Sequence, residues 1–152
     1  MNILPTSYVE RSFSVEKQTV FELLHSMDNF TNRLIIQWNK IFTEDLGISH
    51  ILTLGYLDTN GKARPSQIAK ELGLTAPTVT HLTNKLVKRQ LVTRLFDEND
   101  RRIILLEITN EGKGILDQAN KDGHKLREEM FMKLTAGERE QLLQIFTKLN
   151  ET

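Results

Sequence analysis

A segment near the middle of the chain combines hydroxyl, amide and cationic side chains at helical spacing. If this segment is a helix, its outer face carries, at 100° per residue, Pro77, His81, Asn84 and Lys88, flanked by Thr80 and Lys85. The face offers donors, acceptors and positive charge, and it contains no acidic residue. Such a face suits contact with duplex DNA, since bases present donors and acceptors and the backbone is anionic.

A second candidate for this chemistry lies shortly after the first, in the turn sequence 97–102. Asp100 and Arg102 are two residues apart on the expected edge of a hairpin, so they point to the same side and can pair. The pair would hold the tip rigid, and a guanidinium fits the narrow minor groove of A·T-rich DNA. The alternative is a solvated ion pair that contributes less than about 1 kcal/mol.

The charge distribution favours the same part of the chain. The sequence has 152 residues with 20 basic and 20 acidic side chains, so its formal net charge is zero. Residues 62–102 nevertheless hold nine basic and four acidic residues, and the flanking segments are acidic. A basic lobe between acidic flanks indicates a surface that faces a polyanion, although a chance fluctuation on a solvated surface would look the same.

Several functional classes are excluded or disfavoured. The chain has no cysteine, so it has no disulfide, thiol switch or Cys-ligated zinc. No apolar run approaches 18 residues and the N-terminus does not resemble a signal peptide, so we expect a cytoplasmic protein without a membrane partner. Phosphate-binding glycine loops and the common hydrolase motifs are absent, and we expect no enzyme and no cofactor.

The elements that must position these residues follow from apolar periodicity and capping residues. They are an arm over 1–13, helices beginning near Ser14, Ser49, Pro65, Thr75, Thr109 and Thr135, and β-prone strands over 91–96 and 103–108. The expected fold is mainly α with a small β-hairpin. The Gly73–Thr75 turn would set two helices across each other, and the hairpin follows them, which is the order of a winged helix-turn-helix.

The sequence resembles the MarR family of bacterial transcriptional regulators. The stretches that carry the resemblance are 67–75 as the helix-turn segment, 78–82 where the family usually has Thr-Val-Ser-Arg-Leu, 85–92, the wing 97–102, and Ile108-Thr109-Asn110-Glu111-Gly112. The likeness covers essentially the whole chain. It implies one domain over 1–152, with a winged helix-turn-helix over about 46–112 and dimerisation helices over 14–43 and 113–152.

The resemblance and the residue types together assign candidate DNA contacts. We expect the recognition helix to use Thr75, Ala76, Pro77, Thr78, Thr80, His81, Asn84, Lys85 and Lys88, the wing to use Asp100, Arg101 and Arg102, and Arg64, Ser66 and Gln67 to contact the DNA backbone. Lys85 and Lys88 are expected on phosphates rather than bases. The alternative for Thr80 and His81 is an exposed helix face without a role.

Two positions depart from the family pattern. Gln90 stands where glycine is usual, so we expect the recognition helix to end without an easily formed left-handed residue. His81 replaces the usual arginine. A neutral histidine still offers one donor and one acceptor, but it lacks a fixed charge, so the base preference there is open.

The implied partners are double-stranded DNA with a pseudo-palindromic operator, a second copy of the chain in a homodimer, and a small organic effector whose binding residues we do not assign. A metal is not expected, because the histidines and acids at Glu22, His25, His50 and His124 do not form a convincing ligand spacing. The alternatives are a winged-helix accessory or protein-interaction module, or a constitutive or metal-responsive repressor.

Overall fold

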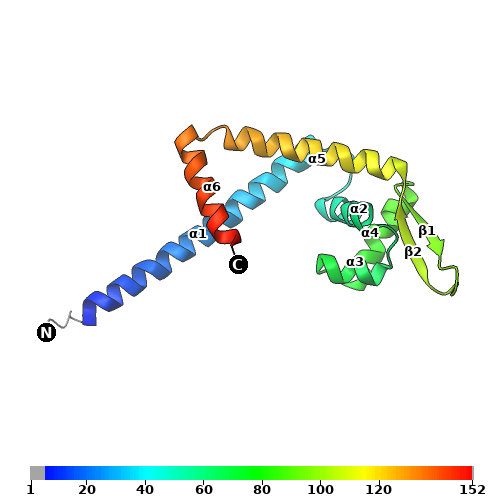
Figure 1. The fold of residues 1–152 in the computed structure, drawn as a ribbon, viewed down its shortest axis with the longest axis horizontal. Helices are drawn as coiled ribbons and strands as arrows, with labels where there is room; N and C mark the ends of the chain where they lie inside the picture. The colour runs from blue at the N-terminus through cyan, green and yellow to red at the C-terminus, as the bar shows by residue number, and fades with distance from the viewer. Residues whose placement is uncertain (1–5, 152) are drawn as a thin grey trace. The chain divides into compact units, whose positions relative to one another are not determined.

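The computed structural model describes residues 6–151, and the chain divides into two compact units between Gln37 and Trp38. Helix α1 spans Thr6–Ile41 (Figure 1). Its residues up to Gln37 belong to the first unit, and its last turn, from Trp38 on, belongs to the second unit. The expected arm over 1–13 is therefore wrong for residues 6–13, while residues 1–5 lie outside the described part. No glycine or proline separates Thr6 from Ser14, so once a helix has formed nothing in this stretch stops its propagation.

Large apolar side chains remain exposed along α1. They are Val20, Phe21, Leu23, Leu24, Met27, Phe30, Ile35, Ile36 and Ile41. Their spacing is that of an amphipathic helix, which usually buries such a stripe against another element.

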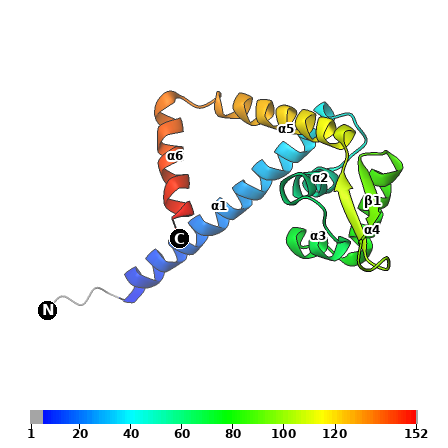
Figure 2. The same cartoon turned by 45° about the vertical axis from the view of Figure 1, so that its right-hand side comes forward.

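The second unit contains the predicted helices and hairpin (Figures 1 and 2). After α1 come α2 (Ile48–Asn60), α3 (Pro65–Leu72), α4 (Ala76–Lys88), β1 (Val92–Phe96), β2 (Ile104–Ile108), α5 (Asn110–Phe131) and α6 (Ala136–Asn150). The mainly helical fold with a small hairpin is confirmed. The second helix begins one residue before the expected cap Ser49, because Gly47 occupies the N-cap position and its N–H donates to Nδ1 of His50.

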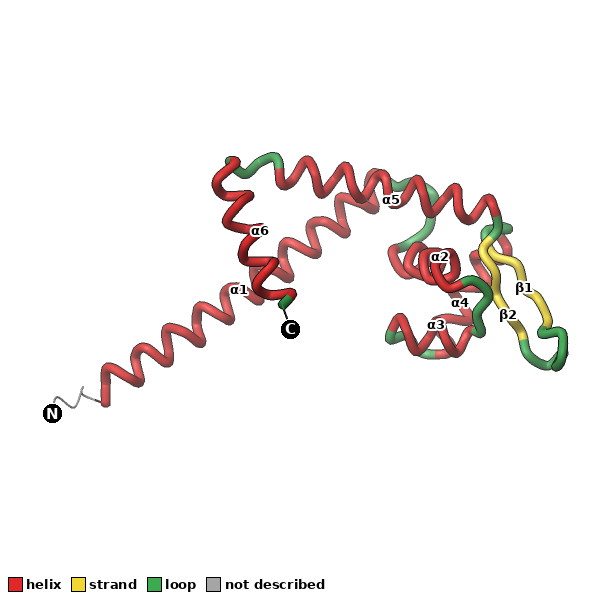
Figure 3. Tube along the Cα trace, in the orientation of Figure 1, coloured by secondary structure: helices red, strands yellow, loops and turns green. Residues whose placement is uncertain are grey.

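A compact core joins α2, α3, α4 and the hairpin. Its most deeply buried large side chains are Leu54, Leu57, Ile68, Leu86 and Leu106. The strands pair antiparallel from Val92↔Ile108 to Phe96↔Ile104, as the predicted hairpin requires, and Figure 3 shows the loop that joins them. The core thus fixes α4 against the hairpin, which are the two elements expected to contact DNA.

The start of α5 is tied to the end of α4. Thr109 caps α5 by accepting a hydrogen bond from the Gly112 N–H at 3.0 Å, and its hydroxyl donates to the Gln90 carbonyl oxygen at 2.8 Å. A Cβ built on Gly112 would lie 2.2 Å from the carbonyl oxygen of Leu91. Close backbone approach therefore explains why glycine follows the threonine by three residues.

Helix α6 has the predicted capping box, in which Thr135 and Glu138 exchange hydrogen bonds. None of its residues is buried, and Leu143, Ile145, Phe146 and Leu149 are exposed. Within the described part of the chain, no helix is both long enough and apolar enough to cross a bilayer.

Candidate nucleic-acid interface

The turn between α3 and α4 has the geometry that its sequence predicts. Gly73 adopts a left-handed conformation, with φ 63°, which glycine takes without steric cost. Thr75 caps α4 by accepting from the Thr78 N–H, and the two hydroxyl groups lie 2.8 Å apart. The turn therefore ends α3 and begins α4 within a few residues, as a helix-turn-helix requires.

The outward face of α4 presents exposed polar groups. Thr80, His81, Asn84 and Lys88 are all exposed, whereas Val79, Leu82 and Leu86 on the opposite side are buried. Thr80 donates its hydroxyl proton to the Ala76 carbonyl oxygen at 3.0 Å, which leaves the Thr80 oxygen as an acceptor. Ala76, Pro77 and Thr78 are exposed in the first turn of the same helix.

Asn84 has a partner that the sequence did not predict. Nη2 of Arg94, on β1, donates to Oδ1 of Asn84. Because a guanidinium has only donors, the amide must turn its oxygen toward Arg94 and its NH₂ group away. The hairpin therefore orients one of the side chains expected to contact DNA.

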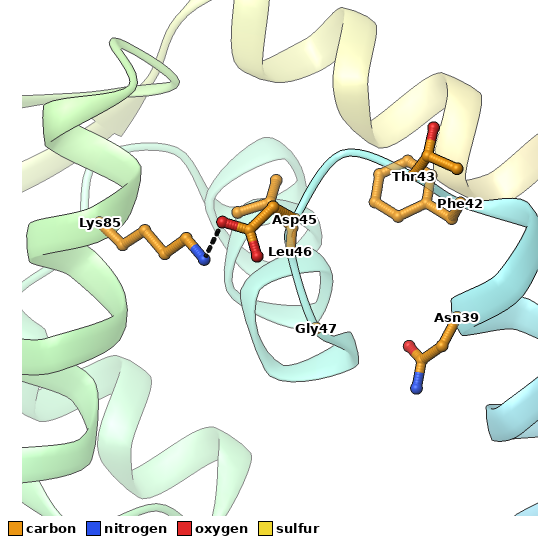
Figure 4. A pocket seen from close by; sticks show the side chains of 7 residues that line it. All are labelled: Asn39, Phe42, Thr43, Asp45, Leu46, Gly47 and Lys85. Atoms are coloured by element: carbon orange, nitrogen blue, oxygen red, sulfur yellow. Dashed lines mark hydrogen bonds and ion pairs between the residues drawn. The ribbon is translucent and has the colours of Figure 1, made fainter.

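Two acidic residues in the α1–α2 loop bind a cation of α4 and the cation that follows it at the C-cap. Lys85 Nζ lies 2.9 Å from Asp45 Oδ2, and Arg89 Nη2 lies 2.9 Å from Glu44 Oε2 (Figure 4 shows the first pair). Nη1 of Arg89 also donates to the carbonyl oxygen of Glu44. The hydrogen bond from Lys85, together with its charge, lowers the pKa of Asp45.

A hollow of about 400 Å³ adjoins the Lys85–Asp45 pair, and Figure 4 shows the side chains that line it. Close by, the Nδ1 atom of His50 accepts from the Gly47 N–H at 3.1 Å, so the proton of the neutral ring is on Nε2. That Nε2 atom is buried and has no hydrogen-bond partner. Burial lowers the pKa of His50, and the nearby charge of Lys85 lowers it further.

The residues expected on the DNA backbone lie at the start of α3, where Arg64 is the N-cap and Ser66 and Gln67 belong to the first turn. The Arg64 N–H donates to Oε1 of Gln67 at 2.8 Å, which leaves the Gln67 NH₂ group as a donor. Ser66 and the side chains of Arg64 and Gln67 are exposed. This helix N-terminus therefore carries outward donors of the kind that contact phosphates.

The wing pair that the sequence predicts is present. Nε and Nη2 of Arg102 lie 3.0 and 3.1 Å from the two carboxylate oxygens of Asp100, in a bidentate arrangement. The hydrogen bonds from the Arg102 side chain and backbone lower the pKa of Asp100. Asp97 accepts from two backbone N–H groups of the same turn, and Arg101 is exposed. The tip is thus ordered by its own carboxylates.

Sequence reasoning missed Glu44, Asp45 and Arg94. The two loop acids lie 40 and 45 residues from the cations that they bind, and no periodicity relates positions so far apart. The expectation for Gln90 was wrong, since Gln90 adopts φ 60° without being glycine, and its carbonyl oxygen is held there by Thr109. No cluster of three metal-ligating side chains occurs among the described residues.

Known proteins share both sequence and structure with this chain. A model of the MarR family matches residues 44–103. The transcriptional repressor MprA of Escherichia coli is 30% identical over 122 residues, which cover 78% of this chain and 69% of MprA. An identity of this extent over two thirds of the relative places the two chains in one family.

Solved structures agree. Apo MarR from Escherichia coli superposes with a TM-score of 0.72 and 22% identity, covering 99% of each chain. BpsR from Bordetella bronchiseptica, whose DNA binding is regulated by 6-hydroxynicotinic acid, superposes with a TM-score of 0.66 and 19% identity, covering 84% of this chain and 92% of BpsR. These two similarities establish the fold.

Proposed function

Because the chain belongs to the MarR family of DNA-binding transcriptional regulators, which are not enzymes, we propose that it is a dimeric repressor released from a pseudo-palindromic operator by a small organic ligand. The observation that carries the proposal is the outward face of α4, which holds His81, Asn84 and Lys88 and no acid, beside an ordered wing bearing Arg102. Repression is favoured by the relative MprA, which is a transcriptional repressor.

We assign the reading of bases to α4 and the minor groove to the wing. Thr80 would accept hydrogen bonds from base edges and Asn84 would donate them, while Lys88 would contact phosphate. Arg102 keeps one edge of its guanidinium on Asp100 and is otherwise exposed, so it can enter a narrow minor groove. The donors of Ser66 and Gln67 would position α3 on the backbone.

The dimer is supported by apolar surface at both ends of the chain. The exposed apolar residues of α1 and of α6 form stripes that a soluble monomer rarely leaves uncovered. A second copy would bury the same stripes on both subunits, as a two-fold axis requires. Two recognition helices would then meet half-sites about one helical turn, roughly 10 bp, apart.

A DNA-binding assay tests the palindrome. The probe is an operator fragment selected from genomic DNA with the purified protein, compared with a fragment that carries one half-site. We expect the full palindrome to bind much more tightly, because both subunits contribute. Equal affinity for the two fragments would contradict the proposal.

A pair of variants on α6 tests the dimer. Leu143→Glu puts a charge on the exposed apolar stripe, whereas Gln144→Glu adds the same charge to its neighbour, also exposed. Light scattering should show a monomer for Leu143→Glu and a dimer for Gln144→Glu. Deletion of residues 138–152 should also abolish the dimer, and a stable dimer after deletion would overturn the assignment.

Release by a ligand is tested with aromatic carboxylates, zinc and hydrogen peroxide. A hundredfold loss of operator affinity requires a ligand to favour the non-binding state by about 2.7 kcal/mol. We expect release by an aromatic acid and no reversible release by peroxide, because the chain has no cysteine. Release by zinc alone would favour a metal-responsive repressor, and no release by any probe would favour a constitutive one.

A further inference from the structure

The two acidic residues of the α1–α2 loop bind the cations at the end of α4 in different ways. Glu44 holds Arg89 through both its carboxylate and its carbonyl oxygen, and both side chains are partly covered. Asp45 holds Lys85 through one hydrogen bond, and the side chain of Asp45 is 92% exposed. Two hydrogen bonds thus hold Arg89 to Glu44, whereas Lys85 and Asp45 form a single ion pair that is exposed to solvent.

Lys85 is adjacent to the DNA-reading face of α4. Lys85 follows Asn84 directly and lies one helical turn from both His81 and Lys88. The side chains of His81, Asn84 and Lys88 are exposed. Its ammonium group is nevertheless paired with the carboxylate of Asp45 (Figure 4). A lysine in this position can satisfy either a carboxylate of its own chain or a phosphate of DNA.

We propose that Asp45 competes with DNA phosphates for Lys85, so that the α1–α2 loop limits the affinity of the recognition helix for DNA. The inference rests on the proposed role of Lys85 as a phosphate contact. When DNA binds, Lys85 moves from Asp45 to a phosphate and the carboxylate of Asp45 is left to take up a cation. The contact therefore contributes less affinity than an unpaired lysine would.

The backbone of the loop offers a clean test. Asp45 has φ 53°, a left-handed conformation that asparagine adopts as readily as aspartate. Asp45→Asn therefore removes the charge without disturbing the turn. Asp58→Asn is the matched control, because it removes one carboxylate from a surface pair with Lys113, which is on α5 rather than on α4.

The experiment measures the dissociation constant for a mixed-sequence duplex over a range of KCl concentrations, in full-length protein. Asp45→Asn should tighten binding by up to about fivefold at low salt, since exposed pairs contribute up to about 1 kcal/mol. The slope of log affinity against log salt should steepen by up to about 0.9, because the freed Asp45 carboxylate no longer takes up a cation that offsets the one released from the phosphate. Asp58→Asn should leave the slope unchanged.

Lys85→Met distinguishes competition for Lys85 from the general effect of removing a negative charge near DNA. In a Lys85→Met background, Asp45→Asn should no longer steepen the slope, because the lysine for which Asp45 competes is gone. An equal effect of Asp45→Asn in both backgrounds, or weaker binding by Asp45→Asn, would overturn the proposal. Failure of the wild-type protein to bind DNA at all would instead contradict the proposed function.

Discussion

Arg94 on β1 donates a hydrogen bond to the side-chain oxygen of Asn84 on α4, and so the wing determines which groups of Asn84 remain free on the outward face of the helix. Asparagine reads adenine by using its oxygen and its NH₂ group together. With the oxygen held by Arg94, Asn84 presents its NH₂ group, which suits acceptors such as guanine O6 and N7 or thymine O4. If Asn84 contacts a base as proposed, a strand residue would influence base preference without touching a base.

The first prediction follows from this contact. Arg94→Met should free the Asn84 oxygen and shift the base preference at one operator position toward adenine, by about 1–3 kcal/mol. The measurement is the affinity for a set of operators substituted at each position. Arg101→Met, which also removes an exposed wing cation, should weaken all operators alike, and the same shift in both variants would contradict the prediction.

The wing tip gives the second prediction. Arg102→Ala should weaken operator binding by about 1–3 kcal/mol if the guanidinium enters the minor groove, with little change in melting temperature because the side chain is 91% exposed. Asp100→Asn should also weaken binding, since the tip loses the carboxylate that holds the arginine. Unchanged affinity in Asp100→Asn would show that this bracing has no role.

Two glycines on α5 give a matched pair for stability. Gly112→Ala places a Cβ against the backbone of Leu91 and should lower the free energy of unfolding by about 1–3 kcal/mol or more. A Cβ at Gly114 would have no atom within 4 Å. Gly114→Ala should therefore raise the free energy of unfolding by about 0.5–1 kcal/mol, because alanine favours the helix. Denaturant unfolding of both variants measures the difference, and similar effects would contradict the close approach at Gly112.

Substitution of the left-handed Gln90 should change the free energy of unfolding in the opposite direction to substitution of Gly112. Gln90→Gly should stabilise the protein by roughly 1 kcal/mol. A residue that has a Cβ is strained at a backbone φ of 60°, and glycine is not. The carbonyl contact with Thr109 is a backbone interaction and should persist. The check is the denaturant midpoint, with Gln90→Ala as control, which should not stabilise.

The last prediction concerns pH. Burial, and then the charge of Lys85, lower the pKa of His50, so the unfolded chain takes up a proton more readily than the folded one. The free energy of unfolding should therefore fall as the pH drops from about 7 to about 5. His50→Gln keeps an acceptor for the Gly47 N–H and does not titrate in this range.

The comparison for that prediction is urea unfolding at several pH values. The wild-type protein should lose stability toward low pH more steeply than His50→Gln. His124→Gln, at an exposed position on α5, should behave as the wild type does. An identical pH dependence in His50→Gln would show that His50 does not govern it.

Apart from the start of α1 and the cap of α2, the sequence by itself determined the elements and the local chemistry. The caps at Thr75, Thr109 and Thr135, the left-handed Gly73 and the Asp100–Arg102 pair all depend on residues within a few positions of one another, and capping rules and side-chain periodicity describe such distances. The resemblance to the MarR family and the polar face of α4 followed from the same short-range patterns.

Only the tertiary structure decided which of those polar groups remain available. Lys85 is held by Asp45 and Asn84 is turned by Arg94, and these contacts arise because α2 and β1 both pack against α4. Gln90 adopts its left-handed conformation against its own preference where the N–H groups of Gln90 and Leu91 donate to the carbonyl oxygens of Val87 and Leu86, and Thr109 donates to its carbonyl oxygen. Contacts between residues far apart in sequence depend on packing. Packing overrides local conformational propensity where it satisfies more hydrogen-bonding groups than the locally preferred conformation would.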